Sequence, residues 1–130
     1  MARSRNGTES ARELAVLAAR TARDYNTEDI VVLDLRNLSP VTEYFVIGTG
    51  TSPRQLRTVA DSVAKAGEAA GQQVWRTAGA ETGNWILLDF VDVVVHLFDS
   101  AHRAYYDLEL IWGGAPRVDW AAGEAKPVQG

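Results

Sequence analysis

The chain has 130 residues, 46% of them hydrophobic and 23% charged, which is the composition of one folded domain and is too apolar for a disordered chain. The absence of cysteine excludes disulfides, thiolate zinc sites and catalysis by a cysteine nucleophile. A formal net charge of −4 argues against direct nucleic-acid binding, in which lysine and arginine displace counterions from phosphates, and makes a basic protein the more natural partner.

The first half of the chain predicts two helices and two strands. Ser10-Ala-Arg-Glu13 has the form of a capping box, and the apolar residues that follow at helical spacing predict a helix over residues 11–24. Two short, β-branched runs predict neighbouring strands at residues 29–36 and 43–48. Ser52, Pro53 and Gln55 combine an N-cap, a proline at the first helical position and a capping-box partner, which predicts a second helix over residues 53–70.

The second half predicts three more strands and a last helix. The strands are expected at residues 73–77, 84–90 and 92–98, and Asp99 or Ser100 can cap a helix that runs to Trp112. The buried stripe of this helix is expected to contain Ala101, Ala104, Tyr105, Leu108, Ile111 and Trp112. The order α-β-β-α-β-β-β-α predicts a single α/β domain with a mixed five-stranded sheet packed by helices.

The domain is expected to span residues 9–112. Residues 113–130 are rich in glycine, alanine and proline without periodicity, so they are expected to form a flexible tail, with Trp120 as the one residue suited to docking back. No apolar run is long enough to cross a membrane, and the N-terminus lacks the apolar core of a signal peptide. The sequence therefore predicts a cytoplasmic protein.

Residues 78–112 form an acidic block. They hold six acids (Glu81, Asp89, Asp92, Asp99, Asp107 and Glu109) and one base (Arg103), which gives a net charge of −5. In the strand at residues 84–90, Trp85, Leu87 and Asp89 share one face, while Ile86, Leu88 and Phe90 share the other, which is expected to be core. An aromatic anchor beside an acid is typical of a protein interface, although burial of both faces under helices is about equally compatible with the pattern.

The last helix offers a second candidate anchor. Tyr106, Glu109 and Leu110 are expected to point away from the buried stripe, so Tyr106 could contact a partner.

Signals for catalysis are weaker. The turn at residues 48–52 resembles a phosphate-binding loop in part, but it lacks the third glycine of a dinucleotide fingerprint and the lysine of a P-loop. Asp89 and Asp92 could hold magnesium for phosphoryl transfer, but positions three apart across a turn need not converge. His96 and His102 lack the further ligands of a zinc site, so His96 is expected to be a hydrogen-bonded structural residue and His102 to be solvated.

A resemblance to a known family covers residues 9–112. The chain resembles the ribosomal silencing factor family, also called the Iojap family, at Trp85, Leu87, Asp89, Asp92-Val-Val-Val-His96, Arg103, Tyr106, Leu108-Glu109 and Trp112, and upstream at Gly48-Thr-Gly-Thr-Ser52 and Asp61. The resemblance implies a nucleotidyltransferase-like fold without established transferase activity. It also implies binding to one protein on the subunit-joining face of the large ribosomal subunit, which blocks the small subunit and represses translation under nutrient limitation.

These observations predict a binding protein with no catalytic residue, cofactor or metal. The expected partner is a basic protein of the large ribosomal subunit, and the residues expected to bind it are Trp85, Leu87, Asp89, Asp92, Tyr106 and Glu109. Two alternatives remain open: a metal-dependent, nucleotidyltransferase-like enzyme, and a homodimer that uses the same surface.

Overall fold

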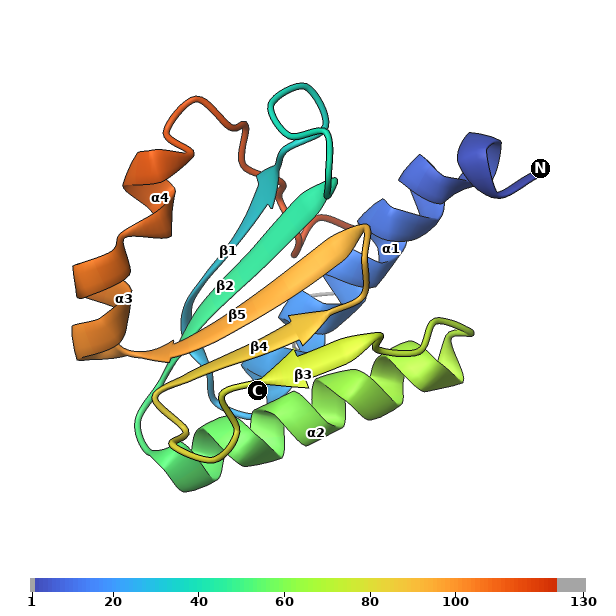
Figure 1. Cartoon of the computed structure of the whole chain (residues 1–130). Coiled ribbons are helices and arrows are strands. Elements are labelled where there is room, and N and C mark those ends of the chain that lie inside the picture. The colour runs from blue at the N-terminus through green and yellow to red at the C-terminus, as the bar shows by residue number, and fades with distance from the viewer. Residues whose placement is uncertain (1, 124–130) are drawn as a thin grey trace, which may run out of the picture.

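The computed structural model describes residues 2–123, which form four helices and five strands (Figure 1). In chain order these are α1 (Ala2–Asp24), β1 (Glu28–Asp34), β2 (Tyr44–Gly50), α2 (Pro53–Ala69), β3 (Arg76–Ala78), β4 (Trp85–Asp89), β5 (Val93–Asp99), α3 (Ser100–Tyr106) and α4 (Leu108–Ile111). The predicted order of elements is confirmed, except that two short helices replace the single helix expected at the end.

The five strands form one mixed sheet in the order β1-β2-β5-β4-β3. Strands β2 and β5 pair in parallel from Tyr44↔Val93 to Gly50↔Asp99, and every other neighbouring pair is antiparallel. The parallel pair lies at the centre of the sheet. In the chain, α2, β3 and β4 lie between its two strands and form the connection that parallel pairing requires. The predicted α/β domain with a mixed sheet is therefore confirmed.

Side chains from the two faces of the sheet enter two separate apolar clusters. The first cluster joins α1 and α2 to one face of the sheet and includes Leu56, Ile86 and Leu88. The second lies on the opposite face and contains Leu33, Leu35, Ile47 and Phe98, with Trp85, Leu108 and Trp112 packed against it. Figure 1 shows α1 behind the strands and α2 along β3, while α3 and α4 lie on the other side of the molecule. This second face carries the candidate site.

The first helix begins earlier than the sequence predicts. α1 starts at Ala2 rather than at about Ala11, so the apparent capping box at Ser10 lies within the helix. A capping box requires serine to leave the helical conformation, but the helix runs through Ser10 without interruption. The Ser10 carbonyl instead accepts a hydrogen bond from the Gln72 side chain at 3.3 Å.

The start of α2 confirms its prediction. Ser52 is the N-cap, its Oγ accepts a hydrogen bond from the Gln55 N–H at 3.1 Å, and Pro53 occupies the first turn. Gln55 Oε1 reaches back to the Thr51 N–H at 2.6 Å. Gly48 and Gly50 belong to β2, and a Cβ on Gly50 would lie 2.4 Å from Leu56. Close packing accounts for this glycine without a bound phosphate.

The last predicted helix is interrupted at Asp107. This residue adopts a left-handed conformation with φ +47° and ψ +57°, and its side chain caps α4 by accepting from the Leu110 N–H. The interruption rotates the following residues relative to the expected stripe. The prediction that Tyr105 lies in the core is wrong, because Tyr105 is 81% exposed while its neighbour Tyr106 is 39% exposed.

Residues 113–123 pack against β1 and α1, and we call this segment the C-terminal strap. The Asp34 N–H donates to the Pro116 carbonyl at 2.8 Å, and the Val118 N–H donates to the Val32 carbonyl at 2.9 Å. The Trp120 indole donates to the Ile30 carbonyl at 3.2 Å. Trp120 therefore docks back, and the part of the predicted tail that the structure describes covers the outer edge of β1. Residues 124–130 lie outside the described part of the chain.

Candidate protein-binding site

Trp85 is positioned by a group of stacked rings on the second face of the sheet. The β4 alternation places it opposite Phe98 of β5, with ring centroids 5.0 Å apart. Tyr106 of α3 covers the indole at a centroid distance of 4.4 Å. Trp85 and Leu87 are half-buried, whereas Ile86 and Leu88 are fully buried, which confirms the predicted assignment of the two faces. The two predicted anchors, Trp85 and Tyr106, therefore touch each other and form one unit.

His96 supports this unit from below. It is 5% exposed, and its Nδ1 accepts a hydrogen bond from Trp85 Nε1 at 3.2 Å. Burial lowers the pKa of His96 from 6.5 to about 4, because desolvation disfavours the imidazolium. His96 is therefore a neutral, hydrogen-bonded structural residue, as predicted. The His102 side chain is only partly exposed to solvent, and its Nδ1 lies 2.9 Å from Asp99 Oδ1.

The acids of the block mainly hold the local backbone. Asp89 Oδ1 accepts from the Val91 N–H at 2.8 Å, and Asp99 Oδ1 accepts from the His102 N–H at 2.8 Å. The His102 N–H is also the main reason why the pKa of Asp99 is lowered. With Asp107 as a third cap, much of the acidity serves the turns that follow β4, β5 and α3. The block still has a formal net charge of −5, and a surface of one sign associates favourably with a surface of the opposite sign.

Glu109 is engaged inside the molecule. Its Oε1 accepts from Arg103 Nε at 3.1 Å, and its Oε2 lies 3.6 Å from Arg117 of the strap. Arg103 is largely buried and also donates to Thr49 Oγ1 at 2.8 Å and to the Asp29 carbonyl. This network joins α3 and α4 to β1, β2 and the strap. It fixes the orientation of α4 and of α3, which carries Tyr106.

Of the most exposed apolar residues in this region, the sequence placed Tyr105 and Ile111 wrongly in the buried stripe, whereas Leu110 points outward as predicted. Tyr105, Leu110 and Ile111 are 81%, 75% and 65% exposed. Tyr105 contacts Tyr106 edge-to-face at 5.1 Å between ring centroids, so it extends the Trp85–Tyr106 unit outward. Large exposed apolar side chains that gather beside charged groups are typical of protein contact surfaces. The sequence signal that could have shown this is Asp107, because aspartate is a favoured N-cap and can begin a new helix whose residues face in a different direction.

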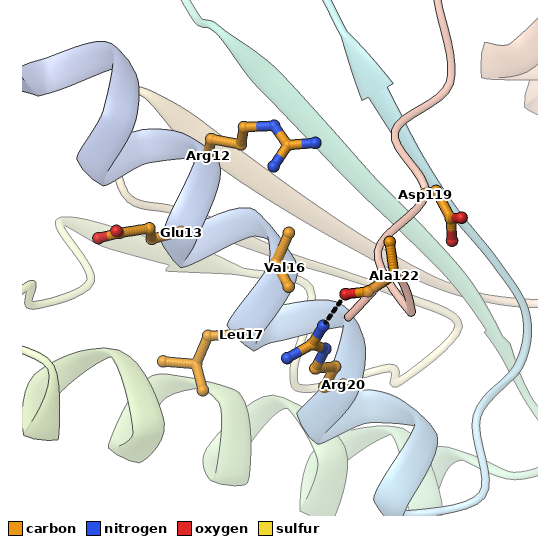
Figure 2. Close-up of a pocket in the computed structure, with 7 residues that line it drawn as sticks. All are labelled: Arg12, Glu13, Val16, Leu17, Arg20, Asp119 and Ala122. Atoms are coloured by element: carbon orange, nitrogen blue, oxygen red, sulfur yellow. Dashed lines mark hydrogen bonds between the residues drawn. The ribbon is translucent and has the colours of Figure 1, made fainter. Parts of the chain in front are cut away.

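The described residues offer little to a metal or a small substrate. Among residues 2–123, no group of three or more histidine, aspartate or glutamate side chains could hold a metal ion. A cavity of about 350 Å³ lies in the seam between α1 and the strap, away from Trp85, and is lined by Arg12, Glu13, Val16, Leu17, Arg20, Asp119 and Ala122. Figure 2 shows Arg20 spanning this seam to donate to the Ala122 carbonyl, at 2.9 Å. The seam thus fastens the strap to α1.

A five-stranded mixed sheet, with two long helices on one face and an aromatic, acidic surface on the other, defines a small α/β domain. Among residues 2–123, no helix has the length and apolar character that crossing a bilayer requires.

Comparisons with known proteins identify the family. The model described as "Ribosomal silencing factor during starvation" matches residues 8–129, so the chain belongs to the ribosomal silencing factor family. Ribosomal silencing factor RsfS from Bacillus subtilis is 39% identical over 103 residues, covering 79% of this chain and 87% of the relative. RsfS from Halalkalibacterium halodurans is 37% identical over 110 residues, covering 85% and 94%.

A solved structure and a plant protein extend the comparison. A crystal structure from Chromobacterium violaceum matches with a TM-score of 0.76 at 37% identity, covering 89% of this chain and 96% of that one. Protein Iojap, chloroplastic, from Zea mays is 36% identical over 107 residues, covering 81% of this chain and 46% of the relative. The predicted family is therefore confirmed, whereas the nucleotidyltransferase-like description of the fold stays a prediction.

Proposed function

We propose that this protein silences ribosomes in the cytoplasm. It binds a basic protein on the subunit-joining face of the large ribosomal subunit, blocks the small subunit sterically and represses translation when nutrients are scarce. Membership of the ribosomal silencing factor family supports the role. The observation that carries the binding proposal is the exposed apolar surface on α3 and α4, which continues the Trp85–Tyr106 unit within a block of net charge −5.

The predicted contact residues have different parts in this proposal. Tyr106, Trp85 and Leu87 supply apolar contact area, since aromatic residues dominate the energy of protein interfaces. Asp89 and Asp92 supply negative charge, which speeds association and fixes the register of the complex. Glu109 acts mainly by holding α4 through Arg103, although its charge also adds to the local field.

Tyr105, Leu110 and Ile111 extend the proposed contact beyond the predicted residues. Their exposure leaves most of each side chain available to a partner. Burying such side chains against a partner removes apolar area from water, which contributes a favourable free energy of about 25 cal/mol per Å². The centre of the contact is therefore expected on α3 and α4, with β4 at its side.

Steric blocking needs only the folded domain. A chain of 130 residues has a radius of gyration of about 14 Å. This is large compared with the close contacts between two ribosomal subunits, so a bound copy would keep the surfaces around it apart. No covalent chemistry is required.

Sucrose gradients with purified ribosomal subunits test the proposal. The protein is expected to sediment with the large subunit and to lower the yield of joined ribosomes when small subunits are added. Tyr106→Ala should weaken binding by about 2 kcal/mol if Tyr106 is a hot spot. Tyr25→Ala is the matched control, because Tyr25 is similarly exposed, at 44% against 39%, but follows α1.

Two results would contradict the proposal. Failure of the unmodified protein to sediment with large subunits would remove the ribosome as its target. Equal binding by the Tyr106→Ala and Tyr25→Ala variants, both still folded by circular dichroism, would remove α3 from the contact surface.

A further inference from the structure

Val91 has a backbone conformation that valine rarely adopts. It is the first residue of the two-residue turn between β4 and β5, which a hydrogen bond of 2.8 Å from the Phe90 N–H to the Val93 carbonyl closes. Its φ is +79°. Glycine is favoured at the first position of such a turn, because a Cβ crowds the backbone when φ is positive. A β-branched residue is a genuine outlier there, and its strain lowers the stability of the folded state.

Packing in the core does not explain the choice of valine. Val91 is 43% exposed and belongs to neither of the two apolar clusters of the described residues. Its neighbours Phe90 and Val93 are 6% and 0% exposed, so they supply the core contacts at this end of the hairpin. Residues that break a local rule without a gain inside the fold are expected at functional sites. The gain from valine at this position is therefore expected outside the folded domain.

The position of Val91 connects it with the proposed contact surface. Trp85, Leu87 and Asp89 occupy alternate, half-buried positions on one face of β4, and Val91 is next in this row. Asp89 links the strand to the turn, because its Oδ1 accepts the Val91 N–H at 2.8 Å. The row therefore leads from the aromatic anchor Trp85, past a carboxylate, to an exposed apolar side chain at the end of the sheet away from α3 (Figure 1).

One bound protein is large enough to cover the whole row. Trp85 and Val91 are six residues apart, which corresponds to about 20 Å at a rise of about 3.3 Å per residue. A standard protein interface buries about 800 Å² on each partner, which is a patch about 30 Å across. A single contact centred on α3, α4 and β4 therefore reaches Val91.

The turn is held in place by the start of β2. The Asp92 carbonyl accepts from the Glu43 N–H at 2.8 Å and from the Tyr44 N–H at 3.1 Å. Valine also has few rotamers, because its side chain branches at Cβ. A side chain that is already ordered loses little conformational entropy when a partner covers it, so Val91 is prepared for contact.

We infer that Val91 contacts an apolar side chain of the basic large-subunit protein, at the edge of the surface formed by α3, α4 and β4. The inference rests on the proposed function and extends that contact along β4 to its last turn. Two observations favour this occupant. Val91 continues the row that begins at Trp85, and it lies beside Asp89 within the block of net charge −5, which suits a basic partner.

Val91→Gly separates the strain of this residue from its contact. Glycine adopts positive φ without strain, so the free protein should melt about 3 °C higher. The same change removes the side chain from the contact, so binding to purified large subunits should weaken about fivefold in co-sedimentation. A variant that is more stable yet binds less well cannot be explained by misfolding.

Val91→Asn is a second variant that keeps a side chain at this position. Asparagine tolerates positive φ better than valine does, so this variant should also melt at a higher temperature. Its amide is polar, so the apolar contact is lost and binding should again weaken about fivefold.

Asn26→Gly is the matched control. Asn26 also has a positive φ, of +67°, and is exposed. It lies between α1 and β1, where its carbonyl accepts from the Gln55 side chain of α2 at 3.0 Å. The substitution places glycine at a left-handed position away from β4, so binding should not change.

The outcomes separate the inference from the proposed function. If the unmodified protein does not sediment with large subunits, the proposed function fails. If it binds, and Tyr106→Ala weakens binding while Val91→Gly and Val91→Asn bind like Asn26→Gly, Val91 is not a contact and the inference alone is overturned. If both Val91 variants melt at a lower temperature than the unmodified protein, valine stabilises the fold and the inference is also wrong.

Discussion

Acidification should destabilise this protein through one buried residue, His96. The imidazole is held neutral under the Trp85–Tyr106 unit, and its Nδ1 accepts the Trp85 indole N–H. Protonation would place a charge in an apolar site and would replace this acceptor with a donor. The folded state therefore resists protonation, while the unfolded chain does not.

The size of the effect follows from the two pKa values. The pKa of His96 has its ordinary value of 6.5 in the unfolded chain and falls to about 4 in the folded protein. The unfolded chain binds more protons between these values, so the stabilisation is complete above pH 6.5 and is lost as the pH falls toward 4. Linkage gives a loss in the free energy of unfolding of about 2 kcal/mol at pH 5 relative to pH 7. That is a large share of the roughly 5–15 kcal/mol typical of a small domain.

Urea unfolding at pH 7 and pH 5 measures this loss. His96→Asn should remove most of the difference between the two pH values, because its amide oxygen can still accept from Trp85 but does not titrate. His102→Gln should keep the difference, since His102 lies on α3 with a partly exposed side chain. The reasoning is refuted if the unmodified protein loses no more stability than His96→Asn over this interval.

Two further substitutions test the α2 cap and the C-terminal strap. Ser52→Ala should lower the free energy of unfolding by about 1 kcal/mol, because the Gln55 N–H loses its acceptor; a thermal melt equal to that of the unmodified protein would contradict this. Trp120→Ala should cost about 2–3 kcal/mol, through lost packing and the lost hydrogen bond to Ile30. Trp75→Ala is its control, because Trp75 is 69% exposed, and equal losses in urea unfolding would show that the strap contributes little.

Much of the fold could be predicted because its signals are local. Ser52 and Pro53 define the start of α2 within a few residues of sequence, and the structure begins the helix where they predict. The alternation of Ile86 and Leu88 with Trp85 and Leu87 identified the core face of β4 correctly, since the side chains of a strand alternate strictly. Such features depend on neighbours in the sequence and not on the rest of the fold.

Other features depend on contacts that local patterns do not contain. The left-handed conformation of Asp107 changes the phase of the residues that follow it, and α3 turns Tyr106 rather than Tyr105 onto Trp85. A single continuous helix was the simpler prediction from spacing alone. Only the docking of Trp120 was predicted for the strap, because short irregular segments dock through individual hydrogen bonds and carry no periodicity.

The candidate site was predictable in position more than in role. The sequence located Trp85 and Tyr106 on one surface, and the structure brings their rings into contact. It treated Asp89 and Glu109 as contacts for a partner, although Asp89 caps the Val91 N–H and Glu109 holds Arg103. Charge can be counted from a sequence, but the local hydrogen bonds of each carboxylate require coordinates.

The strap has a consequence for how this protein is made. Trp120 closes against Ile30 across 90 residues of chain, and the parallel β2–β5 pair joins segments that are far apart in the sequence. Long-range contacts form late, and synthesis proceeds from the N-terminus. The outer edge of β1 therefore stays unpaired until residues 116–120 have been synthesised. A nascent copy can pair all five strands once Asp99 is available, but the edge of β1 is covered only after the strap has followed.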